Sequence, residues 1–375
     1  MSAVRPLRAA LTAGALGLWA SASGEAHASC AGTLRRTWRS YVRHFIQDDG
    51  RVIDHKGGGI STSEGQTYAL MRAVWADDQK TFDKALRWTR DNLQGGDPGA
   101  LPAWRWGQRP DGGWGVLDAQ PAADADQLLA WSLLLAARRW EAPAYAQQAK
   151  AVLDQLWARE VREVAGRLVL LPGPWAEGGD PLRLNPSYLL PFAWRSFAEV
   201  DPSHPWTRLI DDSYAILAEA GLEKGLAPDW LYLDPRTLAR VPAPDPAHEL
   251  FGFEASRFAW TLAAEVAWSD EVRARRLLVP IAMLGRAFDE RGALPAIFDA
   301  AGTAKAPYSH LSMSGSVLAA WTYARPEDAD ALADQIDDAR QGPGWGERDD
   351  YYAQNWTWLG LALRCGQAAP PERLR

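Results

Sequence analysis

The chain has 375 residues, 47% hydrophobic and 23% charged, and its 47 acidic and 40 basic side chains give a net charge of −7. This composition excludes an intrinsically disordered chain, and two Cys are too few for a disulfide scaffold. The acidic balance argues against a nucleic-acid partner, because phosphate binding needs a concentrated basic surface.

The first 28 residues have the pattern of an export signal. Arg5 and Arg8 precede a mostly apolar stretch over 9–20, and residues 26–28 read Ala-His-Ala, the form of a signal-peptidase site. The stretch is shorter than the roughly 20 residues that a membrane span requires. We therefore expect a signal peptide over 1–28, cleavage after it, and a periplasmic or secreted protein of residues 29–375 without a membrane span. The alternative is a disordered extension on a cytosolic protein.

Both Cys lie in the predicted mature chain, Cys30 near its start and Cys365 near its end. Because an exported protein meets an oxidising compartment, a bridge between the two ends is the simplest pairing, and two unpaired thiols are the alternative. No Cys or His pattern has the spacing of a metal site, so we expect no metal and no cofactor.

Apolar periodicity predicts helices along most of the mature chain. A stripe at helical spacing marks 145–156 and another 82–93, while 128–137 is apolar on all sides, as in a helix enclosed by others. Strand-like alternation is limited to short pieces such as 168–170. The absence of a fixed-period repeat argues against a solenoid, so we expect one domain built as a closed toroid of helix pairs. The other predicted helices are 64–76, 187–199, 206–220, 254–267, 270–288, 310–323, 327–340 and 351–364.

Acidic residues stand at three predicted helix starts beside aromatic-rich loops: Glu64, the pair Asp124 and Asp126, and Glu254. Each has a structural explanation, because the helix dipole favours an acid in the first turn and 63–66 has a capping-box pattern. Their combination indicates chemistry, since cleaving a glycosidic bond needs one carboxylic acid and one carboxylate, with aromatic platforms for the sugar rings. No serine-hydrolase, P-loop or dinucleotide motif competes with this interpretation.

A set of motifs runs in order along the mature chain: Thr62–Tyr68, Asp78–Asp83, Trp88-Thr89, Ala122–Asp126 with the helix after it, Asn185–Tyr188, Ala227–Trp230 and Tyr351-Tyr352. Together these segments resemble glycoside hydrolase family 8 over nearly the whole mature chain. Two residues depart from the family pattern: Ala123 stands where Ser or Thr is usual, and Leu129 where Ile or Met is usual. Within the family, 101–104, 170–173 and the two terminal Cys most resemble the periplasmic endoglucanases that accompany bacterial cellulose synthase.

The resemblance implies an all-α fold, the (α/α)6 barrel with an open substrate cleft, and an endoglucanase that cuts β-1,4-glucan with inversion. Glu64 takes the position of the general acid, so its pKa should be raised by burial or by nearby carboxylates. Asp124 takes the position that contacts the sugar at the cleavage point and stabilises the transition state, with Asp126 as a structural partner. In inverting enzymes the two working carboxyls stand ~6.5–9.5 Å apart, which leaves room for a water.

The general base departs from the family. Glu254 stands where the family's endoglucanases carry Asp, which keeps the carboxylate and adds one methylene. Either the backbone sits further back and Glu254 activates the water, or the longer side chain narrows the water site and slows turnover. We favour an active base, oriented by Tyr188 and by Arg257, which lies on the same helix face three residues later.

Nine of the 20 Trp fall into two groups by their position in the sequence. Those within predicted helical stripes are expected to pack in the core: Trp131, Trp140, Trp157 and Trp356. Trp in Gly- and Pro-rich loops are expected to stack on sugar rings, with Asn185 and Tyr351 as further substrate contacts. These loop residues are Trp104, Trp106, Trp114, Trp175 and Trp230.

The sequence thus predicts an exported cellulase that binds cellulose or cello-oligosaccharides and trims chains during bacterial cellulose synthesis, with the cellulose synthase and export complex as a partner. Two alternatives stay open. One is a family member acting on chitosan or xylan; a chitosan cleft should carry extra acids, and Asp111, Asp118 and Glu177 lie in loops. The other is a weakly active or non-catalytic glucan-binding factor of the export machinery. Glu254 keeps this alternative open, because the family's endoglucanases carry Asp as the base at this position.

Overall fold

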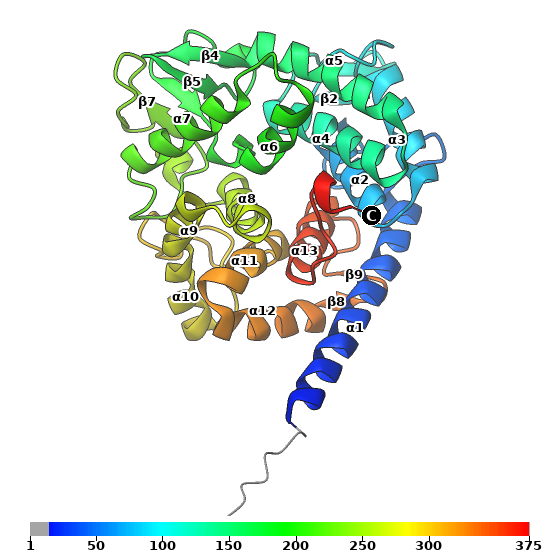
Figure 1. Cartoon of the computed structure of the whole chain (residues 1–375), viewed down its shortest axis with the longest axis vertical. Helices are drawn as coiled ribbons and strands as arrows, with labels where there is room; N and C mark the ends of the chain where they lie inside the picture. Colours follow the sequence, from blue (N-terminus) through cyan, green and yellow to red (C-terminus); the bar gives the residue numbers. More distant parts are fainter. Residues whose placement is uncertain (1–14, 375) are drawn as a thin grey trace, which may run out of the picture.

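Six helices of the described chain form a closed ring at the centre of the molecule. The structure, a computed structural model, describes residues 15–374, with side chains from Cys30 on. Each inner helix contacts the next, and the last contacts the first, as Figure 1 shows. In ring order these helices are α2 (Ser63–Trp75), α4 (Ala123–Arg139), α6 (Pro191–Val200), α8 (Phe253–Ser269), α11 (Leu311–Ala324) and α13 (Tyr351–Arg364).

A second layer of helices packs around this ring, one against each inner helix. The inner and outer layers together make an (α/α)6 barrel, the fold class that we predicted. The outer helices, in the same order, are α3 (Gln79–Asn92), α5 (Pro143–Glu160), α7 (Trp206–Glu219), α9 (Val272–Leu278), α12 (Pro326–Asp338) and α1 (Ala15–Phe45), with α10 (Leu284–Arg291) following α9.

Short antiparallel strands lie in the connections between helices. The predicted strand at 168–170 is confirmed as part of β5. A three-stranded sheet comprises β1 (Ser61–Thr62), β2 (Arg105–Gln108) and β3 (Trp114–Asp118), and the two-stranded pairs are β4 (Val161–Val164) with β5 (Arg167–Leu170), β6 (Leu182–Leu184) with β7 (Leu231–Leu233), and β8 (Arg340–Gln341) with β9 (Gly344–Trp345).

The two layers differ in the way that the sequence pattern indicates. In α4 every side chain from Ala123 to Ala136 is buried, whereas α5 buries only one stripe that includes Val152 and Leu156. The inner helices α11 and α13 approach closely at Gly315 and Gly360, where an added Cβ on Gly360 would lie 2.0 Å from the Gly315 carbonyl oxygen. Glycine is therefore needed at this crossing.

The Trp predicted to pack in the core do so. Trp131 and Trp356 are buried, and Trp131 contacts Phe192 and two further Trp rings. Trp140 is half-buried, with its ring against Phe82, and Trp157 packs against Trp206. These four rings belong to the helix packing.

Three helix predictions need correction. The part of α1 from Cys30 to Phe45 was not predicted, although its buried apolar residues recur at helical spacing. The predicted helix 270–288 is interrupted by a 3-10 segment, Val279–Met283, because Pro280 has no N–H to donate to the preceding turn. The predicted helix 187–199 begins only at Pro191, because a proline is tolerated at the first position of a helix but not further inside it.

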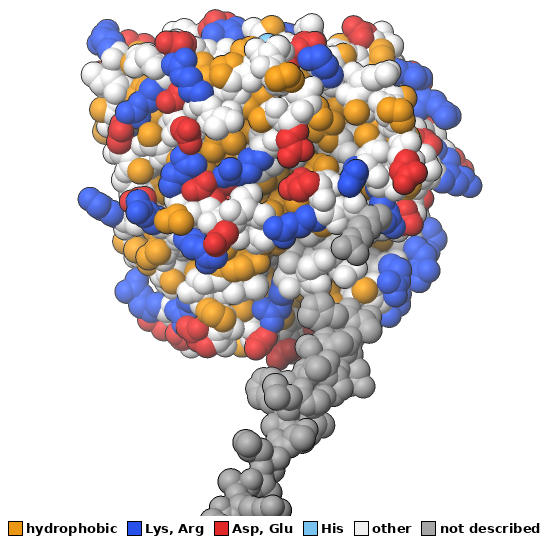
Figure 2. Space-filling model, in the orientation of Figure 1, with side chains coloured by type: hydrophobic (Ala, Val, Ile, Leu, Met, Phe, Trp, Pro, Cys, Tyr) orange, Lys and Arg blue, Asp and Glu red, His pale blue; other side chains and the backbone are white. Residues whose placement is uncertain are grey.

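The ends of the described chain are tied together. Cys30 at the side of α1 and Cys365 at the end of α13 form a disulfide that closes a sequence separation of 335 residues, the pairing we considered simplest. The predicted signal peptide falls on residues 1–14, which lie outside the described residues, and on the first part of α1, so cleavage stays a prediction. Over the described residues, no helix has both the length and the apolar character needed to span a bilayer. On the face drawn in Figure 2, acidic and basic side chains are interspersed.

Candidate active site

Three carboxylates meet where α2, α4 and α8 begin. Glu64, Asp124 and Glu254 each occupy the first turn of an inner helix. Arg257, one turn into α8, binds all three: Nη1 donates to Glu64 Oε2 and to Asp124 Oδ2, each at 2.8 Å, and Nη2 donates to Glu254 Oε2. The Arg257 side chain is only 4% exposed. One buried cation therefore holds all three candidate catalytic acids in fixed relative positions.

The start of α2 differs from the capping box that we predicted. Thr62 is the N-cap, and its hydroxyl accepts from the Gly65 N–H at 3.0 Å, so Gln66 lies one residue too late to close the box. Gln66 instead accepts from the Val52 N–H at 2.6 Å. Because the cap is made by Thr62, Glu64 is left free to face the carboxylate cluster.

Glu64 has the electrostatics of a proton donor. Burial, together with the charges of Asp124 and Glu254, raises its pKa to about 7, although Arg257 and a hydrogen bond from Tyr351 act in the opposite direction. The Tyr351 hydroxyl donates to Glu64 Oε1 at 3.1 Å. The raised pKa has the direction and the causes that we expected, and it keeps Glu64 protonated at mildly acidic pH.

Asp124 lies deeper than the other two acids, at 5% exposure. Its Oδ1 accepts from the Ala125 N–H at 2.8 Å and its Oδ2 from Arg257. Burial and the charge of Glu254 raise its pKa, while Arg257 lowers it. A side chain held at both oxygens is suited to fixing a substrate hydroxyl in one orientation.

Glu254 is the most accessible of the three acids, with its side chain 34% exposed. Asn185 Nδ2 donates to Glu254 Oε2 at 2.9 Å, beside the bond from Arg257 to the same oxygen. Among the side chains that the structure describes, none hydrogen-bonds the other oxygen, Oε1. One oxygen is thus anchored and the other is available to a water, which is the geometry that a general base requires.

Sequence reasoning missed one residue that positions Glu254. Asp229, in the Ala-Pro-Asp-Trp motif, accepts from the N–H groups of Gly252 at 3.0 Å and Ala255 at 2.7 Å, at the start of α8. It replaces the N-cap side chain that Gly252 lacks. Its burial raises its pKa to about 6. The only sequence signal was its place in a family motif.

Three predicted residues make contacts to the carboxylate cluster that the sequence did not indicate. Tyr188 does not hydrogen-bond Glu254; its ring lies 5.3 Å from Cζ of Arg257, so it packs against the residue that holds the base. Asn185 and Tyr351, predicted as substrate contacts, bind the carboxylates of Glu254 and Glu64. All three therefore contact the catalytic cluster directly.

The predicted sugar-stacking Trp form two clusters, one near Glu64 and one near Glu254. On the Glu64 side, the three-stranded sheet continues from β1 and carries Trp106 stacked on Trp114 at 5.3 Å, with Arg51 against both rings. Trp114 is 51% exposed, so it presents free ring surface that the half-buried Trp106 supports. Trp104 lies beside the start of α2, since its carbonyl accepts from the Ser63 N–H at 3.0 Å.

On the Glu254 side, Trp175 and Trp230 form the second cluster, with ring centres 6.3 Å apart. Trp175 is 43% exposed, and Trp230 packs against Tyr188 at 6.1 Å. Aromatic rings therefore lie near both candidate acids, where they could stack on the rings of a sugar chain.

A second pair of acids is buried behind Asp124. Asp126 on α4 and Glu160 at the end of α5 are both 0% exposed, and among the described residues their carboxyl oxygens have no hydrogen-bond partner other than each other. Burial and the neighbouring charges raise the pKa of Glu160 to about 8 and that of Asp126 well above its usual range. The two carboxyls therefore share protons at neutral pH, in keeping with a structural role for Asp126.

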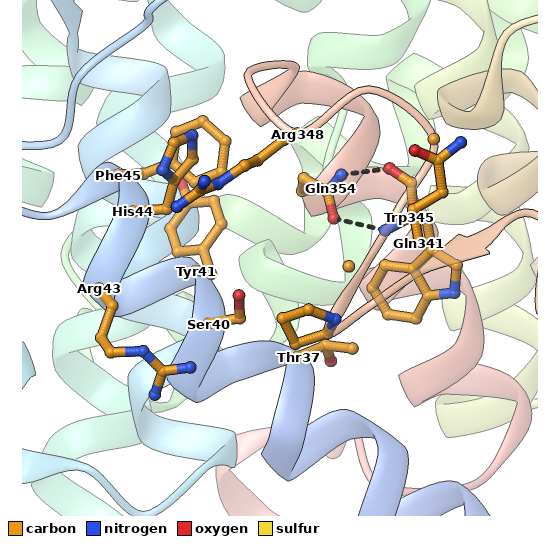
Figure 3. A pocket seen from close by; sticks show the side chains of 13 residues that line it. Thr37, Ser40, Tyr41, Arg43, His44, Phe45, Gln341, Trp345, Arg348 and Gln354 are labelled. Atoms are coloured by element: carbon orange, nitrogen blue, oxygen red, sulfur yellow. Dashed lines mark hydrogen bonds between the residues drawn. The ribbon is translucent and has the colours of Figure 1, made fainter.

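Other candidate sites lie away from the carboxylates. A cavity of about 460 Å³ lies between α1 and the β8–β9 hairpin; Figure 3 shows Tyr41, Trp345 and the hydrogen bonds of Gln354 there. Asp154, Asp201 and His204 lie close enough together to hold a cation, but Asp201 already binds His204 and Trp206. Within residues 30–374 this is the only such group of three.

Comparison with known proteins places these residues in a family context. Residues 7–366 match the family model described as glycosyl hydrolases family 8. An endoglucanase of Pseudomonas fluorescens is 39% identical over 200 residues, which are 52% of this chain and 50% of the relative. An endoglucanase of Xanthomonas axonopodis pv. citri is 38% identical over 247 residues, which are 64% of this chain and 63% of the relative. The matches thus span between half and two thirds of these relatives' lengths.

A solved structure extends the similarity to nearly the whole fold. The endo-1,4-D-glucanase of Vibrio fischeri superposes with a TM-score of 0.73 at 31% identity, covering 87% of this chain and 93% of that one.

Proposed function

Because the chain belongs to glycosyl hydrolase family 8, we propose that it is an exported endo-β-1,4-glucanase that cuts cellulose-type chains with inversion of configuration. One observation carries this proposal. A single buried guanidinium, that of Arg257, holds a protonatable Glu64, a deep Asp124 and a partly exposed Glu254 together. Related proteins called endoglucanase support the same substrate class.

Glu64 is the general acid in this proposal. With a pKa of about 7 it carries a proton at mildly acidic pH and donates it to the glycosidic oxygen as the bond to the anomeric carbon breaks. Its ionised form is then stabilised by Arg257 and by the Tyr351 hydroxyl, which already contact its two oxygens. The cluster therefore stabilises the charge that Glu64 acquires during the reaction.

Glu254 is the general base. Asn185 and Arg257 hold its Oε2, which leaves Oε1 available to the attacking water. Oε1 takes a proton from this water as the water attacks the anomeric carbon. Glu64 and Glu254 bind different nitrogens of Arg257, and in an inverting reaction the acid and the base act on opposite faces of the sugar. Asp124 binds a hydroxyl of that sugar and favours its distorted, transition-state shape.

Viscosity loss of a soluble cellulose derivative tests this function. The wild type should lower the viscosity rapidly, while Glu64→Gln and Glu254→Gln should remove nearly all activity because each deletes one proton transfer. Glu177→Gln is the matched control, since this surface acid binds Arg162 and lies outside the cluster. Full activity in Glu64→Gln would refute the acid assignment. Proton NMR of the first product tests inversion, which requires the α-anomer to form first.

We further propose that the protein acts in the periplasm or outside the cell, trimming cellulose beside the synthase and export complex. The signal-like first 28 residues and the disulfide between Cys30 and Cys365 support an oxidising compartment. N-terminal sequencing of the exported protein should begin at Ser29. Retention of the whole chain in the cytosol, with both thiols reduced, would refute this location.

A further inference from the structure

Arg183 carries an unpaired positive charge beside the second Trp cluster. Its Cζ lies 3.7 Å from the ring centre of Trp230 and 5.0 Å from that of Trp175. Across the part of the chain with described side chains, no carboxylate pairs with its guanidinium, and its Nε is buried without a hydrogen-bond partner. Arg51 in the first cluster differs, because its guanidinium donates to Ser61 and to the Gly59 carbonyl.

Contacts connect Arg183 to the catalytic centre. Arg183 is the middle residue of β6, and Asn185 directly follows that strand with an extended backbone and binds Glu254. Aromatic contacts also connect Arg183 to Arg257. Arg183 contacts the Trp230 ring, Trp230 packs against Tyr188, and the Tyr188 ring packs against the guanidinium of Arg257. A glucan chain that leaves the cleft on the Glu254 side therefore passes this guanidinium.

Acids in the neighbouring loop do not neutralise Arg183. Both carboxylate oxygens of Glu177 are bound by Arg162. Asp180 lies 3.7 Å from Arg236. The charge of Arg183 is thus available to a ligand bound at the surface beside Trp175 and Trp230.

We propose that Arg183 selects the substrate by charge, favouring neutral and anionic β-glucans and disfavouring polymers of amino sugars at a subsite beside Trp175 and Trp230. This inference rests on the proposed function. A neutral glucose ring stacks on the exposed indole of Trp175 and accepts hydrogen bonds from the guanidinium, whereas the ammonium group of a glucosamine unit is repelled by it. A carboxylate-bearing chain is attracted instead.

Soluble polysaccharides that share a β-1,4-linked sugar backbone but differ in charge test the proposal. We would measure kcat/KM on neutral hydroxyethyl cellulose, anionic carboxymethyl cellulose and cationic chitosan at low salt, for the wild type, Arg183→Gln and Arg183→Lys. Arg236→Gln is the matched control, because it removes an arginine charge from the same region at a side chain that is 78% exposed. Each ratio of two substrates is measured within one variant, so a reduced folded fraction cancels.

The anionic-to-neutral ratio should fall roughly fivefold in Arg183→Gln, as expected for one charge acting at short range in water, and should change little in Arg183→Lys or Arg236→Gln. High salt should remove the difference. Chitosan cleavage relative to the neutral glucan should rise in Arg183→Gln. If both glucans are cut but their ratio does not change in Arg183→Gln, or the wild type prefers chitosan, the inference about Arg183 is wrong while the hydrolase assignment stands. If the wild type cuts neither glucan, the proposed function itself fails.

Discussion

Shortening Glu254 to aspartate tests whether its longer side chain is correctly placed for catalysis. The change removes one methylene, so the carboxylate retracts by up to about 1.5 Å if the backbone stays in place. Glu254 Oε2 is now 2.9 Å from Asn185 Nδ2, and retraction by that length takes the pair beyond hydrogen-bond distance. The bond to Arg257 is lost in the same way.

The expected cost follows from this displacement. A positional error of about 1 Å in a catalytic group costs on the order of a hundredfold in rate, so Glu254→Asp should lower kcat by roughly that factor. Glu254→Gln keeps the length but cannot accept a proton, and should lose about 10²–10⁴-fold. KM should change little in both variants, because the side chain acts on the water rather than on the sugar.

Initial rates of reducing-end release from a soluble glucan would measure both effects. Glu177→Asp is the control for the same chemical change at a surface glutamate paired with Arg162. A Glu254→Asp enzyme as fast as the wild type, or faster, would refute the reasoning, because it would mean that the extra methylene moves the carboxylate away from its water. The backbone of α8 would then lie at the distance that suits the shorter aspartate.

Other contacts lead to three further predictions. Tyr351→Phe removes the hydrogen bond that stabilises ionised Glu64, so the pKa of Glu64 rises and the alkaline fall in kcat/KM, expected near pH 7 in the wild type, should move to higher pH; an unmoved profile would contradict the assignment. Glu160 and Asp126 have raised pKa values in the folded chain, so the free energy of unfolding should fall as pH rises from about 4.5 to 8, by at most ~1.4 kcal/mol per unit for one proton. Glu160→Gln should flatten that dependence in urea titrations between pH 5 and 8, and an unchanged slope would refute the shared-proton interpretation. Cys365→Ser opens the long disulfide loop and should lower the free energy of unfolding by up to ~5 kcal/mol in the chain-entropy view, while a melting temperature equal to that of the wild type would contradict it.

Much of the fold could be predicted from the sequence, because the apolar periodicity that marks each helix is contained within a short segment of the chain. The apolar stripe of α5 and the wholly apolar stretch of α4 each predict both a helix and its layer, since periodicity reflects how many faces a helix buries. Predictions failed where proline competed with that pattern, as at Pro280, and in α1, whose buried Leu34, Trp38 and Phe45 lie at helical spacing.

The sequence by itself identified the candidate catalytic acids. Glu64, Asp124 and Glu254 are recognisable as acids in the first turn of helices beside aromatic loops, because first-turn position and residue type are properties of a short segment. The relative placement of those acids was decided only by the closed ring, which brings helix starts nearly two hundred residues apart onto the guanidinium of Arg257. Asn185 on Glu254 and Arg183 between two Trp rings are likewise consequences of ring closure, because contacts between distant segments depend on packing and leave no periodic trace in the sequence.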